Sequence, residues 1–266
     1  MTLTAISRQR HADKRWKRNS SYSFAAKETV APLVIQELPR AVLSLPTGFV
    51  KKDDGYELVA VLGLGSDTNL MVAPDGTWVR GYIPAVYRTY PFALATSKEG
   101  DGVLCIREES GLIGEADGEG EAFFDEQGEP TKTIKDALAF LEQLAGHREQ
   151  TRHVIGLLAE HGVIQPWKIQ FKVGEKEAPL TGLYRVDEKI LNELPADAFE
   201  ALRKGGALSM VYCQLLSMQH MSGLAELFKQ RLVANAQTSE GSTKATAPSA
   251  PDAGGFFNEA GNIKFQ

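Results

Sequence analysis

Residues 180–218 constrain the fold more than any other stretch, because they specify a strand end, a capped turn and three helical segments in succession. The strand runs into Asp187, whose carboxylate is placed to accept hydrogen bonds from the first free amides of a helix. Pro195 opens the next helix, where its missing N–H does no harm. Gly205 and Gly206 end that helix, and an apolar run predicts a buried helix after them. Three helical pieces are therefore expected to pack against another part of the chain.

The stretch from about residue 30 to 125 is predicted to form mainly antiparallel strands. Pro74-Asp75-Gly76 has the chemistry of a tight turn, since proline fixes one φ and Asp-Gly tolerates a positive one. Residues 70–73 and 77–79 are therefore expected to pair as a hairpin. Further strand candidates, rich in β-branched residues or alternating in polarity, are residues 31–35, 56–65, 102–106 and 168–173.

The longest helix is predicted over residues 133–162, with Thr133 as its cap and apolar residues at helical spacing. Histidine is the commonest transition-metal ligand, so the histidines of this helix are metal-site candidates. His147, His153 and His161 are six and eight residues apart, and at 100° per residue they point in different directions. No metal site is expected there.

These patterns predict an α+β protein, mainly antiparallel β in its N-terminal half and helical in its C-terminal half, with a flexible C-terminal tail. Alternating β and α units are absent, which argues against a doubly wound sheet. We expect a single domain over residues 16–235, after a basic N-terminal arm at 1–15. The serine-, alanine- and proline-rich residues 236–255 are expected to be a disordered linker. Residues 256–266 are expected to be an apolar docking peptide.

The docking peptide is apolar for a chain end that follows such a polar linker. Its apolar side chains are Phe256, Phe257, Ile263 and Phe265. A tethered apolar peptide folds back on its own domain or is offered to another molecule, and a linker of this length permits both.

The N-terminal segment carries a cluster of cations around the single acid Asp13, with Trp16 in its middle. The cluster consists of Arg8, Arg10, His11, Lys14, Arg15, Lys17 and Arg18. One interpretation is a solvated extension whose tryptophan docks onto the domain. The other is a binding site for an acidic or phosphate-rich partner, because clustered cations raise local anion affinity.

A formal net charge of −5 argues against a general nucleic-acid-binding protein, which would show a basic field. Cys105 and Cys213 both lie in apolar runs and are expected to be buried free thiols, with a disulfide or a nucleophile as alternatives. No window approaches the roughly 20 apolar residues that span a bilayer, and no apolar leader follows the N-terminal cations. Cytoplasm is the expected compartment.

The densest aromatic stretch, residues 82–92, is the candidate ligand site. Two prolines force it to turn, and aromatic faces beside a guanidinium bind flat or anionic ligands. The alternative is an aromatic plug of the core, with the arginine tied to a carboxylate or carbonyl. The candidate residues are Trp78, Tyr82, Tyr87, Arg88, Tyr90 and Phe92.

Residues 115–129 carry seven acids interrupted by glycines. Asp117, Glu119 and Glu121 suggest calcium ligands, but the glycine and distant glutamate of an EF-hand loop do not follow. An acidic hairpin or solvated loop is expected instead, with no metal. A pair of carboxylates doing acid–base work is the remaining alternative.

Several segments, in order, resemble the recurring segments of the bacterial SapC family over roughly residues 16–232. They are Trp78–Phe92, Ser110–Asp117, Gly182–Glu188, Leu191–Pro195 and Gly206–Met218. The resemblance implies an association with a bacterial surface layer, and it brings no catalytic residues.

The leading hypothesis is a non-enzymatic binding or assembly protein, linked through the family name to cell-surface or uptake functions. It predicts a protein partner at the C-terminal peptide or the basic N-terminal arm. The alternative is an enzyme, or an enzyme subunit, that acts on an aromatic or anionic small molecule near residues 82–92. Arg88 would then anchor the anion, and Glu108 or Glu109 would serve as the base. No cofactor is expected in either case.

Overall fold

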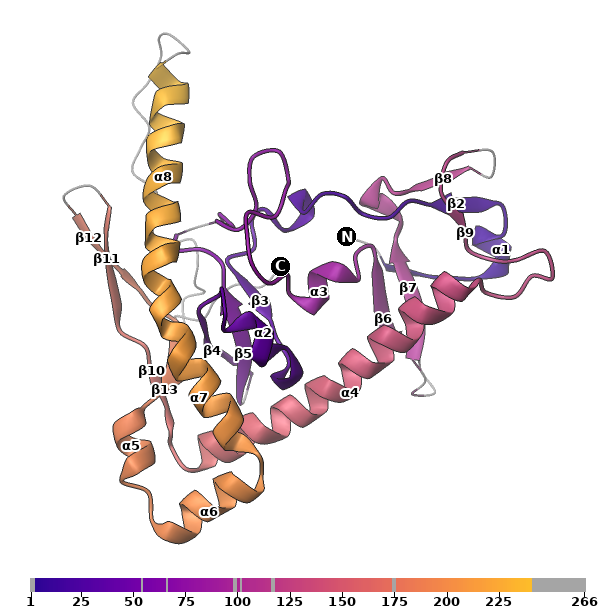
Figure 1. Cartoon of the computed structure of the whole chain (residues 1–266). Coiled ribbons are helices and arrows are strands. Elements are labelled where there is room, and N and C mark those ends of the chain that lie inside the picture. Colours follow the sequence, from indigo (N-terminus) through magenta and orange to yellow (C-terminus); the bar gives the residue numbers. More distant parts are fainter. Residues whose placement is uncertain are drawn as a thin grey trace. The chain divides into compact units, whose positions relative to one another are not determined.

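The computed structural model describes residues 3–53, 55–65, 67–97, 100, 102–115, 118–173 and 176–240 (Figure 1). Contacts within the chain define two compact units. Unit 1 comprises residues 1–21 and 85–148, and unit 2 comprises residues 22–84 and 149–266. Whether residues 16–235 act as a single domain stays a prediction. All strand pairings of the described residues are antiparallel, and the fold is α+β with its helices concentrated toward the C-terminus.

Unit 1 contains two three-stranded sheets, in the orders β1-β7-β6 and β8-β2-β9. The strands are β1 (Leu3–Ala5), β2 (Lys14–Trp16), β6 (Phe92–Thr96), β7 (Gly102–Arg107), β8 (Ile113–Glu115) and β9 (Glu121–Ala122). The helices are α1 (Arg8–His11), α3 (Ala85–Arg88), the 3-10 turn η3 (Glu108–Ser110) and the first part of α4 (Lys132–Glu160). The N-terminal residues thus supply one strand to each of the two sheets. One interpretation of the sequence had made this segment a solvated extension.

The reason is the apolar content of the N-terminal segment. Trp16 is 5 % exposed and meets Phe92 edge-on, with ring centroids 4.8 Å apart. Burying an aromatic side chain of this size offsets the ordering of the short strand that carries it. Around this pair lies the unit 1 core, which also contains Leu104, Ile106, Phe123, Ile134 and Leu141.

Unit 2 is built on a five-stranded sheet in the order β10-β13-β4-β5-β3. Its strands are β3 (Val30–Pro32), β4 (Thr47–Lys52), β5 (Gly55–Val61), β10 (Ile164–Pro166) and β13 (Leu183–Val186), and β11 (Ile169–Val173) and β12 (Lys176–Leu180) form a separate hairpin. The helices are α2 (Leu38–Ala41), the end of α4, α5 (Glu188–Asn192), α6 (Ala196–Lys204), α7 (Ala207–Ser217) and α8 (Met221–Glu240), with 3-10 turns η1 (Ser23–Ala25), η2 (Ile35–Glu37) and η4 (Met218–His220).

The helical signals of residues 180–218 are confirmed. Asp187 Oδ1 accepts hydrogen bonds from the N–H groups of Lys189 (3.0 Å) and Ile190 (3.1 Å). Gly206, with φ of +74°, separates α6 from α7 in a left-handed conformation that costs glycine little. Each junction is therefore set by local chemistry.

A buried polar network joins α7 to the sheet of unit 2. Ser217 Oγ accepts from the Thr47 N–H at 2.9 Å and lies 2.8 Å from Thr47 Oγ1. Gln214 Nε2 donates to the Thr47 carbonyl, and Gln214 Oε1 accepts from the Val186 N–H, both at 3.0 Å. Thr47, Gln214 and Ser217 are each 0 % exposed. The network therefore fixes α7 against β4 and β13 by buried polar groups that hydrogen-bond to one another.

The hairpin predicted around Pro74 is confirmed as a turn with limited pairing. The Ala73 N–H donates to the Thr77 carbonyl at 2.8 Å, and a single antiparallel bridge joins Val72 to Trp78. The predicted cap of α4 is wrong, because that helix already begins at Lys132. Thr133 instead donates to Glu121 Oε2 at 2.6 Å from inside the first helical turn.

The helix α8 continues through residues 236–240, which were expected to begin the linker. The rest of the predicted linker and the docking peptide at 256–266 lie outside the described residues. In the part of the chain that the structure describes, no helix combines the length and apolarity that a bilayer crossing requires.

Candidate functional site

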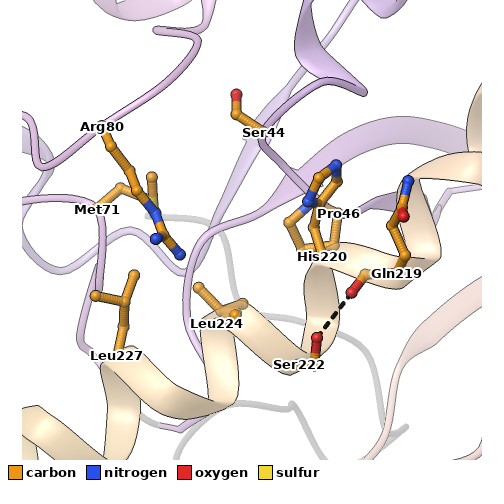
Figure 2. Close-up of a pocket in the computed structure, with 10 residues that line it drawn as sticks. Ser44, Pro46, Met71, Arg80, Gln219, His220, Ser222, Leu224 and Leu227 are labelled. Carbon is orange, nitrogen blue, oxygen red and sulfur yellow. Dashed lines mark hydrogen bonds between the residues drawn. The ribbon is translucent and has the colours of Figure 1, made fainter.

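A cavity of about 140 Å³ lies in unit 2 beside the start of α8 (Figure 2). Its apolar wall consists of the buried residues Pro46, Met71 and Leu224, together with Leu227. Its polar lining is Ser44, Arg80, Gln219, His220 and Ser222. None of the described residues that line the cavity is an aspartate or a glutamate.

Arg80 reaches this cavity because the residues after it are held in place. Gly81 has φ of +74°, and a Cβ atom there would lie 2.4 Å from Ser44 Oγ, so only glycine fits. The Tyr82 N–H donates to Ser44 Oγ at 2.9 Å, and the Tyr82 hydroxyl donates to Glu37 Oε1 at 3.0 Å. The turn that carries Arg80 is thus fixed at Gly81 and at Tyr82.

The opposite wall comes from η4 and the first turn of α8. His220 Nε2 lies 2.8 Å from the Val42 carbonyl, so this nitrogen carries the hydrogen and donates it. The Ser222 hydroxyl donates to the Gln219 carbonyl at 2.9 Å, as Figure 2 shows. A Cβ atom on Gly223 would lie 3.1 Å from Arg80 Nη2. Glycine at this position therefore lets the guanidinium approach the helix backbone.

The six aromatic-site candidates divide between the two units. In unit 2, Trp78 meets Tyr22 edge-on at 5.5 Å, and Tyr82 is bound to Glu37. In unit 1, Tyr87 and Phe92 are 3 % and 7 % exposed and belong to the core. Burial of these two rings agrees with the core-plug interpretation that the sequence left open.

The remaining candidates are Arg88 and Tyr90, also in unit 1. Arg88 is exposed, and its guanidinium carbon lies 5.5 Å from the ring centroid of Phe140 on α4. Tyr90 is half-buried. An arginine stacked on a phenylalanine is held by an aromatic face, but no ligand is needed for that contact. Ligand binding by these residues stays a prediction.

The basic N-terminal residues and the acidic segment pair with each other inside unit 1. Lys14 Nζ lies 2.6 Å from Glu115, Lys17 Nζ lies 3.1 Å from Glu119, and Arg18 Nε lies 2.8 Å from Glu121. Hydrogen bonds from Thr133 and Arg18 hold the pKa of Glu121 below its usual value. These three cations of the cluster that suggested an anionic partner thus pair with acids of their own chain. Asp117, a suggested calcium ligand, lies outside the described residues.

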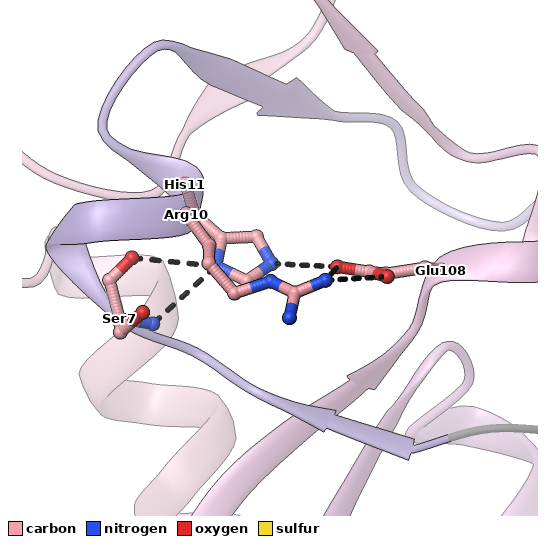
Figure 3. Close-up of polar contacts among 4 residues, drawn as sticks. All are labelled: Ser7, Arg10, His11 and Glu108. Carbon is pink, nitrogen blue, oxygen red and sulfur yellow. Dashed lines mark hydrogen bonds and ion pairs between the residues drawn. The ribbon is translucent and has the colours of Figure 1, made fainter.

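The candidate base Glu108 lies in a second such cluster (Figure 3). Its carboxylate accepts from Arg10 at 3.2 Å and lies 3.7 Å from His11 Nε2. The His11 ring is 5.1 Å from that of Phe123, and its Nδ1 lies 3.3 Å from both the N and the O of Ser7. Burial lowers the pKa of His11 below 6.5, more than its contacts with Ser7 and Glu108 raise it. This cluster ties α1 to the end of β7.

Both cysteines are free thiols. Cys105 on β7 is buried, as expected, whereas Cys213 on α7 is half-buried. Burial raises the pKa of each thiol, which disfavours the reactive thiolate. Among the described residues, no three His, Cys, Asp or Glu side chains gather as metal ligands would.

Sequence reasoning missed Arg80, Ser44 and His220 as residues of one cavity. The available signal was local: Arg80 precedes Gly81 within a segment already selected for its aromatic residues. Nothing in the sequence joins this segment to Ser44 or His220, which lie far away along the chain.

Comparison with known proteins gives one family. Neither curated proteins nor solved structures provide a match. The model of the SapC family matches residues 6–224, which include the segments that carried the resemblance and most of both units. The chain belongs to the SapC family.

Proposed function

We propose that this SapC-family chain is a non-enzymatic binding or assembly protein that docks a partner on an exposed apolar face of α7. The face consists of Tyr212 and Leu216, which are 53 % and 62 % exposed. Residues four apart lie on the same side of a helix, so the two side chains form one apolar surface. This pair is the observation that carries the proposal.

The opposite face of α7 explains why the exposure is informative. Met210, Val211 and Gln214 are all 0 % exposed, so the helix is already anchored to unit 2 by that side. Single exposed apolar residues are common on protein surfaces, but a grouped pair on an anchored helix favours an interaction site. Leu43 is a further exposed apolar residue, at 76 %. It directly follows Val42, whose carbonyl accepts a hydrogen bond from His220, three residues after the end of α7.

The apolar peptide at 256–266 is the second docking element of the proposal. Its phenylalanines and isoleucine have the chemistry that an apolar groove on a partner binds. If the polar residues before the peptide form the linker expected from the sequence, the peptide and the α7 face would act together as two connected binding elements.

The experiment is affinity purification of the N-terminally tagged full chain from its native cells, followed by mass spectrometry. Three variants accompany it: deletion of 256–266, the double substitution Tyr212→Ser with Leu216→Ser, and Val233→Ser as control. Val233 on α8 is 57 % exposed, so its substitution removes exposed apolar area elsewhere.

Partners that are retained by Val233→Ser but lost from the double variant support docking on the α7 face. Partners lost only on deletion of 256–266 assign the interaction to the tail peptide. Recovery of the same proteins from all four chains contradicts the proposal.

A link to the cell surface or to uptake rests on the family name. It predicts that a fraction of the protein is found with the cell envelope on fractionation of the native cells, and recovery of all of it in the cytosolic fraction would contradict this link.

A further inference from the structure

The cavity beside α8 contains the guanidinium of Arg80, which forms no ion pair with an acid among the described residues. Within the part of the chain that the structure describes, no hydrogen bond or ion pair joins Arg80 to another residue. Arg152, Arg185 and Arg203 of the same unit each pair with a carboxylate. Arg80 is also exposed, so its charge is available to a ligand from solvent.

The rest of the cavity restricts what that ligand is. Its floor is apolar: Met71 and Leu224 are each 2 % exposed, Pro46 is buried, and Leu227 is half-buried. A ligand that uses both features has a negative group for Arg80 and a small apolar part for the floor. We propose that this cavity binds a small monocarboxylate, with its carboxylate on Arg80 and its hydrocarbon part against Met71 and Leu224.

The size of the cavity favours a short chain. Its volume is about 140 Å³. Pockets for drug-sized ligands measure roughly 300–1,000 Å³, so this one accommodates only a few heavy atoms. A carboxylate that carries a chain of a few carbons has the required dimensions.

Charge and geometry favour a carboxylate over phosphate. A guanidinium presents paired N–H donors that match the two oxygens of a planar carboxylate. Arg80 is the single arginine in the lining, and the lining has no lysine. A phosphate dianion would keep a second charge next to an apolar floor, which is costly without a second cation.

Two glycines set the position of the Arg80 side chain in the absence of a ligand. Gly81 fixes the turn that carries Arg80, and Gly223 leaves room for the guanidinium against α8. A glycine inside a helix costs about 1 kcal/mol relative to alanine. The close approach of the Arg80 guanidinium provides a structural reason for glycine at position 223.

The test is a methyl NMR titration of the full chain labelled with ¹³C at the methionine methyl groups. The chain has five methionines, and Met71→Leu identifies the signal of Met71. The probe is sodium butyrate, and the neutral control ligand is 1-butanol, which has the same carbon chain. Inorganic phosphate is the third ligand.

Butyrate is expected to shift the Met71 methyl signal to saturation, with a dissociation constant on the order of 1–10 mM for so small a ligand. Phosphate and 1-butanol are expected to leave this signal in place at the same concentrations. Equal shifts with butyrate and 1-butanol, or no saturating shift up to about 100 mM butyrate, would overturn the proposal.

Two substitutions test the role of the guanidinium. Arg80→Gln is expected to weaken butyrate binding about tenfold, the loss that a charged hydrogen bond predicts. Arg152→Gln removes an exposed arginine of the same unit and is expected to leave the affinity unchanged. Unchanged affinity in Arg80→Gln would exclude Arg80 as the anion site. Because Arg80 has no partner to lose among the described residues, this variant is expected to fold, and its unperturbed methyl spectrum checks that.

Discussion

The side-chain oxygen of Gln214 accepts a hydrogen bond from the backbone N–H of Val186 at 3.0 Å, in the fully buried space between α7 and β13. The same side chain donates to the carbonyl of Thr47 on β4. One amide therefore satisfies a donor on one strand and an acceptor on its neighbour.

Gln214→Leu is expected to lower the free energy of unfolding by about 1–3 kcal/mol, because it leaves the buried Val186 N–H without its partner and leaves the Thr47 carbonyl only the longer bond from Ser217 Oγ, at 3.4 Å. Urea denaturation measures the change. Gln230→Leu, at an exposed position on α8, is the matched control and is expected to change the free energy by less than about 0.5 kcal/mol. Similar values for the two variants would show that the network contributes nothing to stability.

The bond between Tyr82 and Glu37 gives a second prediction. Glu37 is 6 % exposed and also accepts from the Val34 N–H at 2.9 Å. Tyr82→Phe removes one donor from this buried carboxylate and is expected to cost about 1–3 kcal/mol of unfolding free energy. Tyr212→Phe removes the hydroxyl of an exposed tyrosine and serves as control in the same urea titration. An unchanged free energy of unfolding in Tyr82→Phe would mean that water replaces the hydroxyl as the donor to Glu37.

Substitution of Gly81 is expected to be costly for two reasons that act together. Alanine would be strained at φ of +74°, and its Cβ atom would lie 2.4 Å from Ser44 Oγ. The expected loss in Gly81→Ala is about 1–3 kcal/mol. Gly156→Ala, inside α4 near its C-terminal end and with open space around it, is expected to stabilise by about 0.5–1 kcal/mol. Thermal unfolding measures whether each variant is more or less stable than the unsubstituted chain. Unchanged or raised stability in Gly81→Ala would contradict the fixed turn.

His11 predicts a dependence of stability on pH. Burial lowers its pKa in the folded chain below 6.5, the value of an ordinary histidine. As the pH falls through that value, the unfolded chain gains a proton that the folded chain does not yet bind, and stability falls. The folded chain is therefore expected to be less stable at pH 5.5 than at pH 7.5.

NMR titration of the His11 ring checks the direction of the shift in the native protein. Urea unfolding at both pH values, with His11→Gln and the exposed control His153→Gln, isolates its contribution. A pH dependence that is unchanged in His11→Gln would assign the effect to other groups. Glu121 does not interfere in this range, because its lowered pKa makes its contribution fall only below the ordinary glutamate value of 4.5.

The two thiols are expected to react in a fixed order. Burial raises both pKa values, but Cys105 is buried in β7 whereas Cys213 is half-buried on α7. An aromatic disulfide reagent should therefore modify Cys213 first, and Cys105 only on unfolding. Cys213→Ser and Cys105→Ser assign the two phases, and early modification of Cys105 would show that unit 1 opens readily.

Local chemistry made much of the fold predictable. The cap at Asp187, the glycines between α6 and α7, and the long helix α4 each follow from neighbouring residues. The strand β4 was missed because Gly48 and two terminal lysines, Lys51 and Lys52, interrupt its apolar pattern. Its place at the centre of the sheet comes from pairing with β5 and β13, which a local pattern does not contain.

Contacts between distant residues account for the rest. The cations of the N-terminus and the acids near residue 120 were each recognised, but as separate surfaces. Lys14 and Glu115 are 101 residues apart, so no periodicity links them. The cavity has the same origin, because Ser44, Arg80 and His220 meet only through the tertiary fold.

The pairing of the first strands with β7, β8 and β9 has a consequence for biosynthesis. Residues 3–16 leave the ribosome well before their partner strands, which begin at residue 102. At roughly 5–20 residues per second, a nascent chain waits about 5–20 s for those partners. During that interval Lys14, Lys17 and Arg18 lack the acids with which they pair, and β2 lacks both of its partner strands. Unit 1 therefore completes its sheets only when β1 and β2 pair with strands that are synthesised much later. In a chain that stalls before residue 102, the residues of β1 and β2 stay exposed to the surrounding cell.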